Sequence, residues 1–171
     1  MLPAGCVIGA VNGPRQVIVA GPAAPLAEAA DRLRAAGLVC LPVAARQAFH
    51  SPALAEAAVE FARAFAEVPL AAPAIPIHST RTGRPVTAAQ AGDPEFWAGQ
   101  LALPVRFDLA LSSLLTTDDL LLLETGPGQG LTTTARRHPA VRSGRATAVP
   151  LLPDVAAARR LLAGRLIGIR P

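Results

Sequence analysis

One histidine, His50, has the sequence neighbourhood of a catalytic side chain. It lies in the stretch Arg46–Pro52, between an apolar segment at 38–43 that predicts a strand and a helix that Pro52 opens in its first turn. A loop between rigid elements can aim an imidazole outward, and imidazole suits general acid–base chemistry near neutral pH. These residues favour a general base and by themselves name no reaction.

Other chemistries find less support in the sequence. The remaining histidines, His78 and His138, are too widely spaced for metal ligands, so no metal site is predicted. The glycine-rich run at 126–130 fits neither common nucleotide-binding motif and indicates a structural turn. All sixteen basic residues are arginine, which excludes lysine Schiff-base chemistry, and no G-x-S-x-G motif is present.

Composition also argues against two classes of protein, those that bind nucleic acid and those that span a membrane. The formal charge is +4, but the arginines are scattered and few aromatic residues accompany them, so we expect no nucleic-acid partner. No stretch approaches the roughly 18 consecutive apolar residues of a membrane span. Because the N-terminus also lacks the pattern of a secretory signal, we expect no membrane partner and a cytoplasmic location.

Hydrophobic periodicity predicts a mixed α/β chain. Its first part is expected to contain strands at 5–12, 15–20 and 38–43 and a helix at 25–36. This β-β-α-β order is most of a ferredoxin-like unit that lacks its first strand and first helix. The chain is therefore expected to be part of a larger fold.

The remaining elements are predicted from the same signals. Leu54, Ala58, Phe61 and Phe65 have helical spacing, and we expect them to be core residues of a helix. The apolar run at 120–124 predicts a strand covered on both faces. The other expected elements are a helix at 52–67, a hairpin around 81–84, helices beginning at 94 and at 106, a helix at 131–137, a linker at 138–153, a helix at 154–163 and a strand at 166–169.

Four stretches are informative when taken together. They are Ala10-Val11-Asn12-Gly13-Pro14-Arg15-Gln16-Val17-Ile18-Val19-Ala20-Gly21, Gln47-Ala48-Phe49-His50-Ser51-Pro52, Gln100-Leu101-Ala102-Leu103-Pro104-Val105-Arg106-Phe107 and Leu123-Glu124-Thr125-Gly126-Pro127-Gly128. In this order they resemble the second half of the acyltransferase domains of modular (type I) polyketide synthases. Those domains are related to malonyl-CoA:acyl-carrier-protein transacylase.

The resemblance implies three parts. Residues 1–45 would be a partial ferredoxin-like subdomain, residues 46–150 the C-terminal part of an α/β-hydrolase-like large subdomain, and residues 151–171 the linker after the domain. The partners implied are an acyl carrier protein, the N-terminal half of the acyltransferase domain and neighbouring synthase domains, in pathways such as antibiotic biosynthesis.

The family's chemistry assigns roles to two residues. In the family, a serine in G-H-S-x-G takes an acyl group from malonyl-CoA and passes it to the phosphopantetheine thiol of the carrier protein. The resemblance implies that His50 is the general base and that a backbone carbonyl at Gln100 orients its ring. No bound cofactor is implied. Because the serine motif is absent, we expect the nucleophile outside this chain and the chain alone to be inactive.

Three further residues are candidate substrate contacts. In the family, His-Ala-Phe-His accompanies malonyl units and Tyr-Ala-Ser-His accompanies methylmalonyl units. The tetrad here is Gln47-Ala48-Phe49-His50, which matches the malonyl type at three positions and departs at Gln47. The resemblance therefore implies a malonyl preference, with Gln47 and Phe49 near the acyl group. Asn12 either faces the substrate cleft or only begins the turn with Gly13.

Two alternatives stay open. The chain could be a structural or docking fragment of a polyketide synthase with no catalytic role, or its N-terminal half could be supplied as a separate chain.

Overall fold

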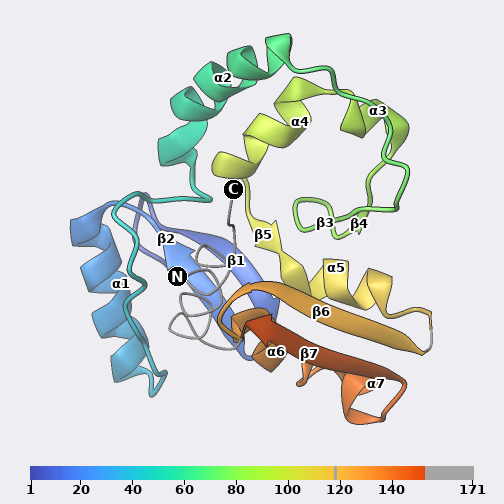
Figure 1. The fold of residues 1–171 in the computed structure, drawn as a ribbon. Coiled ribbons are helices and arrows are strands. Elements are labelled where there is room, and N and C mark those ends of the chain that lie inside the picture. The colour runs from blue at the N-terminus through green and yellow to red at the C-terminus, as the bar shows by residue number, and fades with distance from the viewer. Residues whose placement is uncertain (118, 153–171) are drawn as a thin grey trace, which may run out of the picture. The chain divides into compact units, whose positions relative to one another are not determined.

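The computed structural model describes residues 1–117 and 119–152, and every structural statement below refers to them. The chain forms two compact units, one from Met1 to Ser113 and one that begins at Leu114 (Figure 1). Both contain helices and strands, so the predicted mixed α/β character is confirmed. The predicted partition at residues 45 and 150 stays a prediction.

The first unit begins with the predicted hairpin. Strand β1 (Val7–Gly13) pairs antiparallel with β2 (Gln16–Ala20), and β5 (Val105–Arg106) pairs parallel with the other edge of β1. Three of the seven residues of β1 and three of the five residues of β2 are β-branched, which favours strands. The central strand of this small sheet is β1, and its Gly9 lies against His50.

Helix α1 (Ala23–Ala35) confirms the predicted helix, and a glycine follows its end. Gly37 has a φ of 81°, which glycine adopts without steric cost. The N–H of Gly37 donates to the carbonyl of Arg34, and the N–H of Leu38 donates to the carbonyl of Leu33. This pair of bonds is a Schellman motif, which satisfies carbonyls that the helix end would leave open.

The strand predicted at 38–43 is not formed. These residues are extended without a ladder partner, and Val39 and Leu41 are 87% and 81% exposed. A strand exists only when a neighbouring strand accepts its hydrogen bonds, and no described strand pairs with this segment. The observed order is therefore β-β-α, and the last strand of the predicted β-β-α-β unit was wrong.

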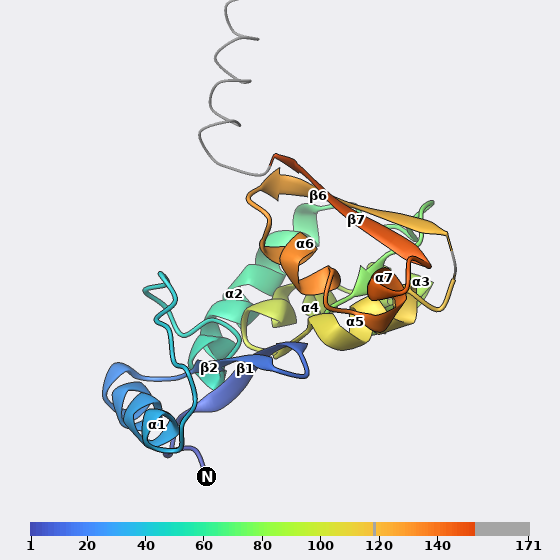
Figure 2. The same cartoon turned by 90° about the horizontal axis from the view of Figure 1, so that it is seen from below.

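The helical run predicted at 52–67 is confirmed as three consecutive pieces. They are η1 (Pro52–Leu54), α2 (Ala55–Ala64) and η2 (Phe65–Glu67). One face of α2 packs against α4 (Pro94–Ala98) and η3 (Gly99–Leu101), which lie beside it in Figures 1 and 2.

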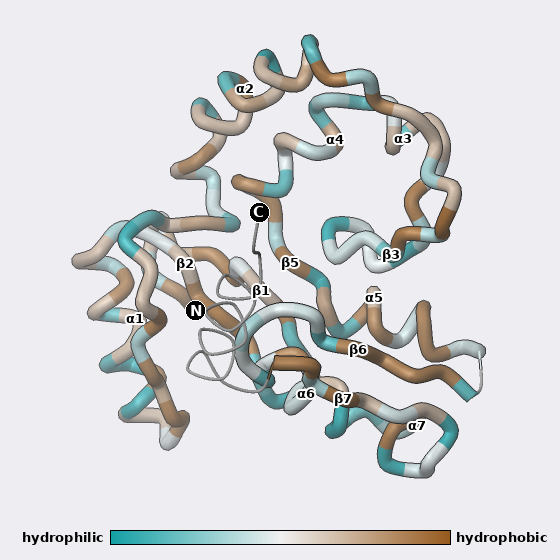
Figure 3. The backbone as a smooth tube through the Cα atoms, viewed as in Figure 1, coloured by the Kyte–Doolittle hydropathy of each residue, from teal (hydrophilic) through white to brown (hydrophobic). Residues whose placement is uncertain are grey.

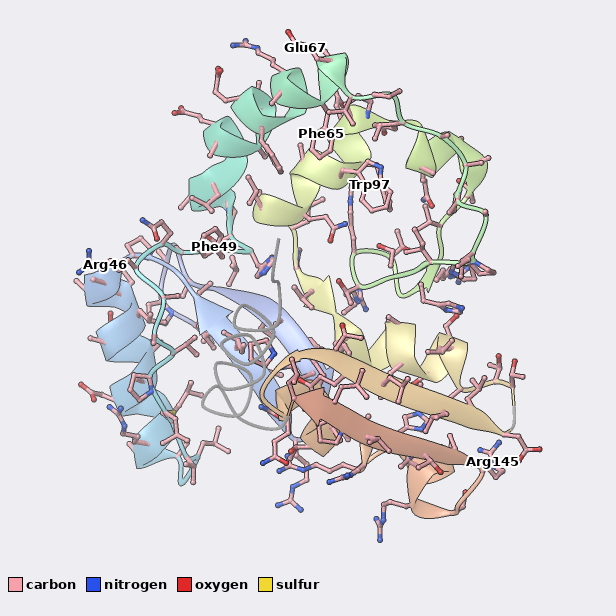
Figure 4. The ribbon with its side chains drawn as sticks, viewed as in Figure 1. Arg46, Phe49, Phe65, Glu67, Trp97 and Arg145 are labelled. Carbon is pink, nitrogen blue, oxygen red and sulfur yellow. The ribbon has the colours of Figure 1, made fainter. Side chains whose placement is uncertain are left out.

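The predicted core role of this helix was partly wrong. Leu54, Ala58 and Phe65 are half-buried, whereas Phe61 is 44% exposed, although its ring lies 4.9 Å from that of Phe65. Phe65 lies between α2 and α4, and Glu67 points outward (Figure 4). Because α4 and η3 are short, they cover only one face of α2, and the other face stays exposed.

Short elements complete the first unit. The predicted hairpin is confirmed, and Asp93 caps α4 by accepting a hydrogen bond from the N–H of Glu95. Gly83 has a φ of 70°, and a Cβ there would lie 2.4 Å from the Cβ of Leu109, so the hairpin turn packs closely against the helix that contains Leu109. The elements are β3 (His78–Ser79), β4 (Arg84–Pro85), α3 (Ala88–Ala91) and α5 (Phe107–Leu114).

The second unit is a two-stranded parallel sheet with two short helices. Strands β6 (Leu120–Pro127) and β7 (Ala146–Leu152) pair parallel, and α6 (Gly130–Ala135) and α7 (Pro139–Arg142) pack against them. The predicted strand at 120–124 and helix near 131–137 are confirmed. The linker predicted at 138–153 was wrong over its described part, because α7 and β7 lie there.

The prediction that both faces of β6 are covered was also wrong. Figure 3 shows that the first part of this strand, its run of leucines, is hydrophobic. Nevertheless, Leu121 and Leu123 are 59% and 49% exposed, whereas their neighbours are half-buried. The helices of this unit cover one face only, so alternate leucines stay open to solvent. The helix predicted at 154–163 and the strand predicted at 166–169 lie outside the described residues, as does most of the predicted linker at 151–171.

Glu124, inside β6, binds the first turn of α6. Its carboxylate accepts hydrogen bonds from the N–H groups of Leu131 (3.1 Å) and Thr132 (2.8 Å). Hydrogen bonds from the Thr132 side chain and backbone lower the pKa of this carboxyl. The glycine-rich turn at 126–130 is therefore closed by a carboxylate, which supports its interpretation as a structural turn.

We expect Glu124→Gln to lower the melting temperature at pH 7, because the neutral amide binds the helix N–H groups less strongly. A pKa below the ordinary 4.5 means that the carboxylate stabilises the fold above that pH and loses this effect as the pH falls through the lowered pKa. The difference between variant and parent, measured by thermal unfolding from pH 7 to pH 3, should therefore shrink in acid. Glu67→Gln at an exposed site is the control, and equal effects of the two changes would contradict the assignment.

Candidate active site

The loop before α2 holds His50 in an uncommon backbone conformation. Its φ is 61°, in the left-handed region that non-glycine residues rarely adopt. The next residue, Ser51, is 1% exposed, and its hydroxyl donates to the carbonyl of Ala48 at 2.6 Å. Such strain persists only where surrounding contacts fix the conformation, and it is frequent at functional sites.

Three backbone carbonyls surround His50. The backbone N–H of His50 donates to the carbonyl of Leu101 at 2.8 Å. The ring atom Nδ1 lies 2.9 Å from the carbonyl oxygen of Gln100 and 3.1 Å from that of Leu103. We call residues 99–103, which carry these oxygens, the carbonyl cradle.

The cradle determines the tautomer of the ring. Carbonyl oxygens only accept hydrogen bonds, so the Nδ1 atom that faces two of them must carry the proton. The neutral ring then has its lone pair at Nε2, the atom that can take a proton from a nucleophile. In a serine triad a carboxylate fixes this tautomer, whereas here neutral carbonyls do so and add less charge stabilisation.

The turn η3 creates the cradle. The carbonyl of Gly99 accepts from the N–H groups of both Ala102 and Leu103, at 3.2 and 3.0 Å. This tight turn after α4 leaves the following carbonyls free of helical partners, as the end of a helix does. Asp93 and Pro94 begin the helix, so local capping fixes where η3 falls along the chain.

Strand β1 lies against the backbone of His50. A Cβ built at Gly9 would lie 3.4 Å from both the Cβ and the carbonyl oxygen of His50, and 3.0 Å from the Cβ of Ala20. The absence of a side chain at this position therefore allows the His50 loop to approach the sheet closely.

The structure brings only some of the predicted site residues together. Gln100 contacts the His50 ring through its backbone, and the Phe49 ring lies 6.5 Å from the imidazole, centroid to centroid. Phe49 is 43% exposed on the loop between α1 and α2 (Figure 4), and Gln47 is exposed on the same loop. Asn12 is half-buried, three residues beyond Gly9, or about 10 Å farther along β1.

The serines of this chain all make interactions within the structure. Ser51 is buried against Ala48, and the hydroxyl oxygen of the buried Ser79 accepts from the backbone N–H of Arg81. Ser112 donates to a carbonyl in its own helix, Ser143 donates to a carbonyl of the helix that it follows, and Ser113 makes a further interaction. None of these five, the full complement of the sequence, lies on a tight strand-to-helix turn like that of a serine nucleophile.

The other histidines have local structural positions. His78 lies in β3, and the Nδ1 atom of His138 accepts from the N–H of Ala140 at the start of α7. Burial, followed by the charge of Arg145, lowers the pKa of His138. Within residues 1–117 and 119–152 there is no group of three or more His, Cys, Asp or Glu side chains that could hold a metal ion. In the same part of the chain, no helix is long and apolar enough to cross a membrane.

Sequence reasoning missed several parts of this site. The carbonyls of Leu101 and Leu103 could not be found, because a backbone acceptor has no residue signature. Gly9 offered a weak signal, since a glycine inside a strand pattern indicates a close backbone approach.

Comparison with known proteins places the chain among acyltransferases. The family model described as acyl transferase domain matches residues 2–164. A phenolphthiocerol/phthiocerol polyketide synthase protein of Mycobacterium tuberculosis is 35% identical over 138 residues, which are 81% of this chain and 9% of that protein. The polyketide synthase GfsB of Streptomyces halstedii is 38% identical over 125 residues, or 72% of this chain and 2% of that protein.

Solved structures agree with this placement. The acyltransferase domain of SpnD, crystallised with 2-(pent-4-yn-1-yl)malonyl, is 30% identical with a TM-score of 0.85, and the match covers 97% of this chain and 42% of that one. The chain therefore spans less than half of the solved domain and a small fraction of the curated relatives. Since the family model covers well over half of its residues, this chain belongs to the acyl transferase domain family.

Proposed function

We propose that this chain supplies the general base of an acyltransferase that moves a malonyl-type unit from CoA to the phosphopantetheine thiol of an acyl carrier protein. The observation that carries the proposal is the contact of His50 Nδ1 with the carbonyls of Gln100 and Leu103. Family membership supports acyl transfer as the reaction class.

His50 would act in both halves of a ping-pong reaction. In the first half, Nε2 takes the proton of a serine hydroxyl as its oxygen attacks the thioester carbonyl, and the imidazolium then gives that proton to the CoA thiolate as the C–S bond breaks. In the second half, Nε2 takes the proton of the incoming phosphopantetheine thiol and returns one to the serine oxygen as the ester is cleaved. The carbonyl at Gln100 keeps Nδ1–H in place throughout, and the serine is supplied by a segment outside this chain.

A non-catalytic role is the alternative. The exposed apolar side chains at 38–43 and on β6 favour an incomplete fold that requires further protein to cover them. This feature fits a docking fragment and equally fits a catalytic segment that joins its other half. The two functions differ in what removal of His50 does once the serine is present.

In a protein that joins this chain to a segment bearing G-H-S-x-G, we expect His50→Ala to slow acyl-enzyme formation from malonyl-CoA by about 10²–10⁴-fold, the usual contribution of a general base. Single-turnover kinetics measures this step directly. His138→Asn, which keeps a side chain that can cap α7, is the matched histidine control and should leave the rate unchanged. Equal rates for His50→Ala and the parent would reject the general-base role and favour a docking fragment.

We also propose that Phe49 favours malonyl over methylmalonyl, because its ring lies beside His50 and would crowd an α-methyl group. One methyl group is worth about 1–3 kcal/mol, or roughly 10–200-fold, of discrimination. We expect Phe49→Ser to reduce the malonyl preference by about that factor in a competition between the two CoA esters.

Phe61→Ser is a matched control for this experiment, since Phe61 is 44% exposed compared with 43% for Phe49 and lies on α2 away from the loop. Its selectivity should equal that of the parent. A parent that loads both units equally well would contradict the malonyl assignment, and an unchanged preference in Phe49→Ser would remove Phe49 as the selector.

A further inference from the structure

One arginine on the β3–β4 turn binds the helix that precedes the carbonyl cradle. The Nη1 atom of Arg81 donates to the carbonyl of Phe96 at 2.6 Å and lies 3.3 Å from that of Glu95. Its guanidinium carbon also lies 4.9 Å from the centre of the Phe96 ring, and Phe96 is 4% exposed. A planar guanidinium can bind carbonyls at its edge and stack on a ring with its face, which an ammonium group cannot do equally well.

The same guanidinium reaches the first residue of the cradle. A Cβ built at Gly99 would lie 3.3 Å from Arg81 Nη1, so the arginine occupies the space beside this glycine. The carbonyl of Gly99 closes η3 by accepting from Ala102 and Leu103. Arg81 thus contacts the residue on which the shape of the cradle depends.

The neighbouring residue on the turn contacts the other end of this segment. The carbonyl of Thr80 accepts a hydrogen bond from the N–H of Arg106, which lies three residues after the end of the cradle. Two adjacent residues of one turn therefore fix the chain both before and after the oxygens that face His50.

The turn itself is rigid enough to transmit this restraint. The buried hydroxyl of Ser79 accepts from the N–H of Arg81, and the carbonyl of Ser79 accepts from the N–H of Gly83 at 2.7 Å. The backbone at Gly83 lies so close to Leu109 that no side chain would fit between them. The backbone that carries Arg81 is thus held on both sides.

We propose that Arg81 is a positioning residue, which holds the carbonyl cradle in the geometry that keeps the proton of His50 on Nδ1. It acts through α4 and Gly99, the parts of the chain that its guanidinium contacts. The inference rests on the proposed role of His50, because the tautomer matters only if Nε2 acts as a base.

The test follows the protonation state of the ring in the 171-residue chain and needs no activity. Long-range ¹H–¹⁵N spectra distinguish Nδ1–H from Nε2–H in a neutral histidine. We expect the parent to be mainly Nδ1–H at His50, and Arg81→Met to shift the ratio toward Nε2–H by about 2–10-fold, the effect of weakening one hydrogen bond. Arg81→Lys, which keeps the charge but not the planar fork, should fall between them.

Arg84→Met is the matched control, since Arg84 is exposed in the same hairpin. It should leave the tautomer ratio at the parent value, whereas a general loss of stability would change melting temperature and not this ratio. If Arg81→Met does not fold, the shift in Arg81→Lys decides the question. A parent-like ratio in the folded Arg81 variants overturns the positioning role alone, while a parent that is mainly Nε2–H overturns the proposed function and this inference with it.

Discussion

The contact between His50 Nδ1 and the backbone carbonyls of Gln100 and Leu103 fixes which nitrogen of the imidazole carries the proton. An imidazole in water exchanges its proton between two nitrogens, and a general base needs one particular nitrogen free. Backbone oxygens solve this problem without a charged residue, because they can only accept. The arrangement requires a turn that presents several carbonyls in one direction, a loop in a strained conformation and a glycine where the loop meets the sheet. Each of these is present around His50.

The sequence marked His50 as the candidate general base but gave little information on its surroundings. His50 stood out because it lies in a loop ahead of a proline-initiated helix, and the position of Gln100 followed from the resemblance to acyltransferases. Leu101 and Leu103 act through atoms that every residue possesses, so no residue type marks them. Nothing in the sequence distinguished Arg81 from the other fifteen arginines. Its connection to the site depends on the packing of the β3–β4 turn against α4, which brings together residues fifteen positions apart.

The fold was predictable where local signals were strong. The helices predicted from 94 and over 25–36 were correct, because helix starts and ends are decided by neighbouring residues such as Asp93 before the first and Gly37 after the second. The strand predicted at 38–43 was wrong, because an apolar run has strand propensity but forms a strand only when a partner strand pairs with it. The linker predicted at 138–153 was wrong for the opposite reason. Residues such as Arg145 and Pro150 indicated a linker, since proline has little strand propensity, but pairing with β6 forms β7 there.

The central claim is that this chain carries the base of an acyltransferase and not its nucleophile. It is tested most directly by incubating the 171-residue chain with radiolabelled malonyl-CoA and analysing the denatured product for a malonyl ester on serine. We expect no such ester, since the sequence lacks the G-H-S-x-G motif and Ser51, beside His50, is buried with its hydroxyl bonded to Ala48. A stable serine ester formed by this chain alone would contradict the account.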